Sequence, residues 1–132
     1  MTDANDATIE QEIVAKGKTA PRVTPADLQD NIASEHYFTA DNGVCGAAAA
    51  AAKTAKKGVF CWESAEPLDL LTFCVLVLKN GFTVTGESAC ASPENFDAEI
   101  GRKIARSNAE QKIWPLMGYQ LKQKMHDAII RC

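Results

Sequence analysis

The sequence predicts an α+β fold in which a small antiparallel sheet is covered by helices. The stretch 70–90 holds an apolar run, an Asn-Gly dipeptide and an alternating run, which together are typical of a β-hairpin. Thr24-Pro25 and Ser92-Pro93 each mark the beginning of a helix. A chain of 132 residues, 46% of them hydrophobic, fits a single domain with a modest core.

The N-terminal part of the chain is expected to contribute little to that core. Residues 1–20 carry several acidic side chains and few large apolar ones, so they are interpreted as a flexible arm. The domain would then comprise residues 21–132. Its first helix is predicted over residues 25–36, because Pro25 follows an N-capping threonine and Leu28 and Ile32 share one face.

Residues 42–66 are interpreted as a variable insertion rich in Ala and Lys. Its alanine run has high helix propensity but no apolar stripe that would dock it. Near its end, residues 59–63 place Phe60 and Trp62 on one face, so this segment is the candidate third strand of the sheet.

The hairpin is predicted over residues 71–90. If residues 80 and 81 form a two-residue turn, Val77 lies opposite Val84 and Cys74 lies opposite Glu87. The first strand is apolar on both faces whereas the second alternates, so the first is expected to be the inner strand.

Two helices are predicted after the hairpin. The first covers residues 93–114, with Phe96, Ile100 and Ile104 as its apolar stripe. Pro115 is expected to interrupt it, and a second helix follows over residues 116–130. The second helix carries an apolar residue at every fourth position, namely Met117, Leu121, Met125 and Ile129.

Three blocks of the chain resemble a known family. They are TPADLQDNIASEHYFTADNG, PLDLLTFCVLVLKNGFTVTGESACASPENFDAEIGRKIA and KIWPLMGY. Together they are similar to the gene-49/gene-66 family of small proteins from tailed phages and prophages. The resemblance implies a phage or prophage accessory protein and carries over no catalytic residues, while the Ala/Lys-rich insertion departs from the family blocks.

Composition and motifs exclude several classes of function. A net charge of −3 without long runs of one sign makes nucleic-acid binding an unattractive interpretation. The chain shows neither a signal peptide nor a run of 18 apolar residues, so a cytoplasmic protein is expected. The five cysteines lack CxxC spacing and are expected to be reduced, and no metal or cofactor is predicted.

One group of polar residues around the predicted start of the 93–114 helix could bind an anion. A helix N-terminus offers unpaired N–H groups, and Arg102 and Arg106 lie one turn apart, where they could hold phosphate groups. The alternative is that these arginines only solubilise the helix and pair with acidic neighbours. The candidate ligand-binding residues are Ser92, Asn95, Arg102, Lys103 and Arg106.

The expected function is a non-enzymatic binding module that acts on a host protein. Phe82 follows the hairpin turn directly, and a turn seldom reaches a core, so Phe82 is predicted to contact a partner. A sequestering protein for a small phosphorylated or nucleotide ligand is the alternative, and an enzyme that uses Cys90 is a minor one. Because a small sheet leaves edges and a face to cover, a homodimer is expected.

Overall fold

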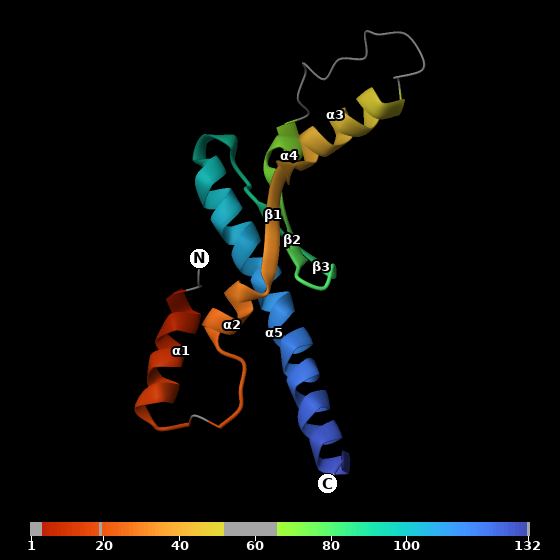
Figure 1. Ribbon diagram of the computed structural model, residues 1–132. Helices are drawn as coiled ribbons and strands as arrows, with labels where there is room; N and C mark the ends of the chain where they lie inside the picture. The colour runs from red at the N-terminus through yellow and green to blue at the C-terminus, as the bar shows by residue number, and fades with distance from the viewer. Residues whose placement is uncertain (1–3, 19, 52–65, 132) are drawn as a thin grey trace.

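The computed structural model describes residues 4–18, 20–51 and 66–131, and it confirms the α+β class (Figure 1). A three-stranded antiparallel sheet in the order β1-β2-β3 is covered on one face by a long helix, α5. The strands are β1 (Ile32–Thr39), β2 (Leu71–Leu78) and β3 (Thr83–Ala89). The helices are α1 (Ala4–Ala15), α2 (Pro25–Asp30), α3 (Ala40–Ala51), α4 (Glu66–Asp69) and α5 (Ala98–Arg131), with a 3₁₀ turn, η1, at Pro93–Asn95.

The prediction that residues 71–79 form the inner strand is confirmed, but its second neighbour is not the predicted one. Strand β1, residues 32–39, pairs with β2, whereas the candidate strand 59–63 lies outside the described residues. The predicted helix 25–36 is therefore wrong beyond Asp30. Helix α2 begins as expected, with the Thr24 hydroxyl accepting from the Asp27 N–H at 3.1 Å, but the next residues alternate between half-buried and exposed as a strand does.

The hairpin differs from its prediction by one residue of register. Val77 lies opposite Thr83, and Cys74 lies opposite Gly86. The turn has three residues rather than two, because only Gly81 adopts a positive φ, of 89°, while Asn80 does not. This geometry is typical of a type I turn followed by a left-handed residue. A shift of one residue exchanges the two faces of β3, so that Val84 and Gly86 point toward the core.

The core lies between the sheet and the first half of α5. From β2 and β3 come the buried side chains Cys74, Leu76, Leu78 and Val84, and from α5 come Ala105, Ala109 and Ile113. The helix approaches β3 so closely that a Cβ on Gly86 would lie 2.2 Å from the Ala105 carbonyl oxygen. Small residues on the helix and a glycine on the strand therefore set the distance between the two layers.

The long helix differs from its prediction at its start, its apolar stripe and its middle. Asp97, rather than Ser92, caps it, since the Asp97 Oδ1 accepts the N–H groups of Glu99 and Ile100 at 2.9 and 3.1 Å. The predicted stripe of Phe96, Ile100 and Ile104 is wrong, because Ile100 and Ile104 are 55% and 46% exposed. The helix also continues through Pro115, where an interruption was expected.

The N-terminal segment forms a helix where a flexible arm was predicted. Polar contacts link α1 to the rest of the domain: Arg22 donates to both carboxylate oxygens of Glu10, at 2.6 and 2.9 Å. The indole N–H of Trp114 on α5 donates to Asp6 at 3.3 Å. Because these anchors are ionic and polar rather than an apolar stripe, the sequence pattern did not show them.

The expectation that all cysteines are reduced is wrong for one of them. Cys45 on α3 is disulfide-bonded. Cys74 and Cys90 are free thiols, and Cys74 is fully buried as predicted.

Candidate functional site

The residues predicted to bind an anion do not converge on one site. The Ser92 hydroxyl is hydrogen-bonded to the Glu94 carboxylate, and this contact lowers the pKa of Glu94, which favours a negative charge in the same turn. The α5 N-terminus is already capped by the Asp97 carboxylate. Lys103 pairs with Glu99 at 3.4 Å. A second anion would therefore meet two carboxylates at this helix start.

The Arg106 side chain is buried in the interior of the protein. It is only 7% exposed, and its Nε donates to Glu110 at 2.7 Å. Its two terminal nitrogens donate to Glu35 on β1 and to Gln29 on α2. Because Glu110 is 2% exposed, this charge cluster joins α5, β1 and α2 inside the fold. The pairing of Arg106 with Glu110 matches the alternative in which the arginine has an acidic helical neighbour.

Arg102, one turn earlier, lies in a different environment. It is exposed, and no ion pair involves it among the described residues. It borders a cavity of about 140 Å³ between the end of β1 and the start of α5. The other residues that line this cavity are Tyr37, Phe38, Thr39, Asn42, Thr72, Phe96 and Ala98. A cation beside three aromatic rings could hold a small anionic ring compound, whereas Asn95 borders a separate cavity.

Two weakly acidic groups, Tyr37 and Cys74, lie on the sheet face that α5 covers. Burial raises the pKa of Tyr37 to about 12, and burial likewise raises the pKa of Cys74 to about 11. Both groups are therefore neutral at physiological pH. Since a nucleophilic cysteine needs a lowered pKa, Cys74 is a packing residue.

Cys90, the candidate nucleophile, lies half-buried just after β3. Its thiol donates to the backbone carbonyl of Ser92 at 3.1 Å rather than to a base. The histidines lie elsewhere: His36 faces away from α5 on β1, and His126 is in the last turns of α5. Among the residues that the structure describes, no cluster of three or more His, Cys, Asp or Glu side chains could hold a metal ion.

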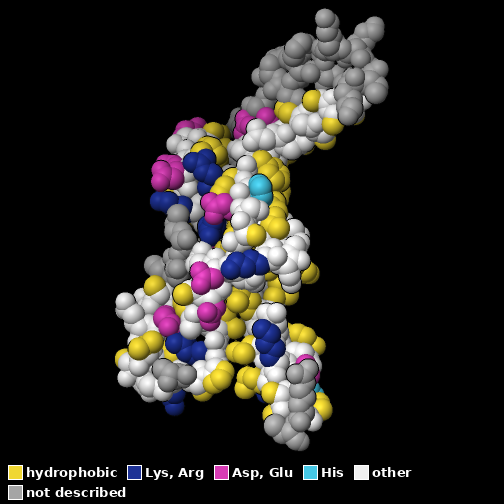
Figure 2. All heavy atoms as spheres, in the orientation of Figure 1, with side chains coloured by type: hydrophobic (Ala, Val, Ile, Leu, Met, Phe, Trp, Pro, Cys, Tyr) yellow, Lys and Arg dark blue, Asp and Glu magenta, His cyan; other side chains and the backbone are white. Residues whose placement is uncertain are grey.

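The second face of the sheet is the largest feature that the sequence did not indicate. On this face Phe73, Val75 and Val77 of β2 are only half-buried, and α3 approaches the face at its Phe38 end, where a Cβ on Gly43 would lie 3.8 Å from the ring. The neighbouring strands add Ser34, His36 and Phe38 from β1 and Thr83, Thr85 and Glu87 from β3. The rings of Phe38 and Phe73 stack with centroids 5.6 Å apart. Hydrophobic side chains gather over the sheet region in Figure 2.

This open face was missed because β1 was predicted as a helix. Residues 34–38 do not alternate between polar and apolar side chains, and only the neighbouring aromatic residues Tyr37 and Phe38 favoured a strand. We call nine outward-facing residues of the three strands the open face; they are Ser34, His36, Phe38, Phe73, Val75, Val77, Thr83, Thr85 and Glu87.

Phe82 lies where the sequence predicted, directly after the turn, and it is 53% exposed. Its N–H donates to the Asn80 side chain at 2.9 Å, which fixes the backbone of the turn. An exposed aromatic ring on an ordered turn is available for contact with a partner.

A comparison with known protein families finds a match. A model of a phage protein family, the N4 Gp49/phage Sf6 gene 66 family, matches residues 23–125. No curated protein and no solved structure matches the chain. Within the described residues, no helix is both long enough and apolar enough to cross a membrane.

Proposed function

Because the chain belongs to the N4 Gp49/Sf6 gene 66 family of phage proteins, we propose that it is a non-enzymatic binding module that acts on a host protein in the host cytoplasm. The observation that carries this proposal is the open face. A sheet with one apolar face covered by α5 and with apolar residues of β2 only half-buried on the other face has a surface left to bury.

The composition of the open face suits a protein rather than a small molecule. Its central strand contributes the apolar side chains Phe73, Val75 and Val77, and Phe38 on the edge strand β1 stacks on Phe73. The other open-face residues of the two edge strands are polar or ionisable. An apolar, aromatic centre with a polar rim is the usual anatomy of a protein interface. Strands of seven or eight residues make the face about 25 Å long, a scale that fits a protein surface.

The test identifies a bound host protein and then locates its contact. The tagged phage protein is used to capture proteins from the host, and each captured protein is purified and titrated directly by calorimetry. Phe38→Asp, at the edge of the open face, is compared with Phe82→Asp, at the turn, because both rings are partly exposed, at 39% and 53%.

If the open face is the interface, Phe38→Asp weakens binding at least about tenfold. If Phe82 is the main contact, only Phe82→Asp does so, which would relocate the interface to the turn. Binding that neither substitution weakens would contradict both sites.

A second candidate function is sequestration of a small phosphorylated ligand. The observation that favours it is Arg102, which makes no ion pair among the described residues and borders the cavity with Tyr37, Phe38 and Phe96. Nucleotides are titrated against the protein and against Arg102→Gln and Lys103→Gln. Loss of binding in the first variant alone would support the cavity. Equal loss in both would indicate general electrostatic attraction and contradict a site at Arg102.

A further inference from the structure

The second half of α5 extends beyond the sheet and exposes large apolar side chains. Residues 115–131 span about 25 Å of helix at 1.5 Å per residue. Figure 1 shows this part of α5 running past the sheet to the C-terminus, and in Figure 2 hydrophobic side chains lie along it. An isolated helix of this length is marginal in water, so a partner that covers it would stabilise it.

The apolar residues of this helix include a stripe with a symmetric sequence. We call Ile113, Met117, Leu121, Met125 and Ile129 the 113–129 stripe; the order Ile-Met-Leu-Met-Ile is the same in both directions from Leu121. Exposure increases along it, from 0% at Ile113 to 41% at Met125 and 74% at Ile129. The inner end is thus covered by the protein's own core, and the outer end is not.

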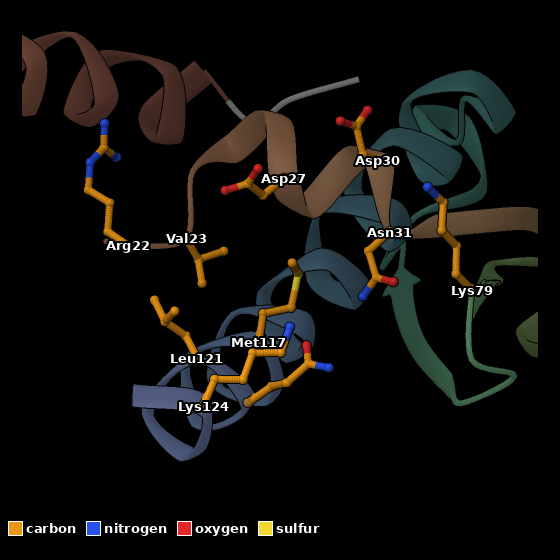
Figure 3. Close-up of a pocket in the computed structure, with 10 residues that line it drawn as sticks. Arg22, Val23, Asp27, Asp30, Asn31, Lys79, Met117, Leu121 and Lys124 are labelled. Atoms are coloured by element: carbon orange, nitrogen blue, oxygen red, sulfur yellow. The ribbon is translucent and has the colours of Figure 1, made fainter. Parts of the chain in front are cut away.

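A groove runs beside the middle of the stripe. It has a volume of about 340 Å³ and lies between the segment 22–31 and residues 117–124 of α5. Figure 3 shows Val23, Met117 and Leu121 on its apolar side. Asp27 and Asp30 lie on the α2 wall, and Arg22, Lys79 and Lys124 also line the groove.

The α2 wall of the groove is acidic, whereas the projecting helix is basic. The described side chains of residues 115–130 include Lys122 and Lys124 against one acid, Asp127. The α2 wall presents Asp27 and Asp30, and Asp30 makes no ion pair among the described residues. A second copy of the helix laid in the groove would therefore bring lysines toward aspartates.

We propose that this surface binds a second copy of the chain, with the two projecting helices antiparallel and crossing at Leu121. Two-fold symmetry then places Met117 against Met125 of the second copy, and the exposed Ile129 at the level of Ile113, where the second copy has its core. Rows of residues four apart that interdigitate give the commonest helix crossing. A helix covers a strip only about 10 Å wide, so the α2 wall is needed to approach the roughly 800 Å² per partner of a stable interface.

The first experiment measures mass in solution and uses a matched pair of substitutions. The full chain of 14.2 kDa is studied by sedimentation equilibrium from 1 to 100 μM, beside Ile129→Glu and Ile130→Glu. The two isoleucines are similarly exposed, at 74% and 67%. Ile130, nine residues after Leu121, points about 180° away from it. The wild type and Ile130→Glu should be dimers, and Ile129→Glu should raise the dimer Kd at least about 100-fold.

A second measurement tests the crossing point itself. Leu121→Cys should form a disulfide with its own counterpart in the second copy, and peptide mass spectrometry identifies that linkage among the native cysteines. A monomeric wild type at 100 μM would overturn the proposal. So would a dimer that Ile129→Glu leaves intact, or one that Ile130→Glu disrupts instead, because each outcome places the contact elsewhere or nowhere.

Discussion

The two halves of α5 belong to one continuous helix, but the first buries small and charged residues whereas the second exposes large apolar ones. Residues 98–114 approach the sheet through small side chains and a charged pair, with Ala105, Ala109 and the Arg106–Glu110 contact all inside. Residues 115–131 carry large aliphatic side chains that stay largely exposed, with Ile129 at 74%. Hydrophobicity alone would predict that residues 115–131 are the buried half of the helix.

The difference shows that backbone proximity, rather than side-chain size, decides what the first half buries. At Gly86 the strand and the helix are so close that no large side chain fits between them. Isoleucines at 100 and 104 are therefore displaced to the outer side of the helix. The second half has no sheet beneath it, so its large residues are free to meet a partner.

Removal of the buried guanidinium should produce the largest loss of stability. Arg106→Leu leaves the carboxylate of Glu110 buried without its partner, which should lower the free energy of unfolding by about 3–5 kcal/mol. Urea denaturation followed by circular dichroism measures this. Arg102→Leu, one turn earlier and exposed, should change stability by less than about 0.5 kcal/mol. Equal effects would show that Arg106 is not a structural residue.

Substitution of isoleucine by alanine at the two ends of the 113–129 stripe should have different effects on the free energy of unfolding. Ile113→Ala should lower the free energy of unfolding by about 2–5 kcal/mol, because Ile113 is fully buried. Ile129→Ala should have almost no effect in protein dilute enough to be monomeric, and a growing one at higher concentration if the second copy covers it. The measurement is thermal denaturation over a range of protein concentrations. A large effect of Ile129→Ala in dilute protein would contradict the exposed position.

A single methyl group on β3 should test the close contact of the first half. Gly86→Ala places a Cβ 2.2 Å from the Ala105 carbonyl oxygen and 2.3 Å from the Ala109 nitrogen, so backbone must move. We expect a loss of about 2–3 kcal/mol in the free energy of unfolding, measured by urea denaturation. Gly46→Ala on α3 has open space around it and serves as the control. A neutral Gly86→Ala would mean that the layers can separate at little cost.

The sequence was sufficient for the fold class, the hairpin and the central position of β2, because each depends on a local pattern. It failed where contacts between distant parts of the chain decide the local structure. Residues 32–36 continue a helical pattern locally, yet pairing with β2 makes them a strand. One further residue in the turn, with Gly81 alone at positive φ, exchanged the faces of β3.

The candidate site shows the same limit. Sequence could place Arg102 and Arg106 on neighbouring turns, but only the fold reveals that Arg106 reaches Glu35 and Gln29, more than seventy residues away. The open face could not be anticipated either, since it requires three strands to be placed in register. Phe82 was correctly expected to be exposed because a turn position is a local property.

The smallest expected effect concerns alkaline pH and the thiol beneath the first half of α5. Burial raises the pKa of Cys74 to about 11 from its usual 9.0, so the unfolded chain releases its proton first. The contribution of the protonated Cys74 thiol to the free energy of unfolding is therefore fully present below pH 9. It is lost as pH rises toward 11, by about 1 kcal/mol at pH 10. Urea denaturation at pH 8 and pH 10 measures the fall, and Cys74→Ala should remove that part of it. If the fall persists unchanged in this variant, another group such as Tyr37, whose pKa is about 12, causes it.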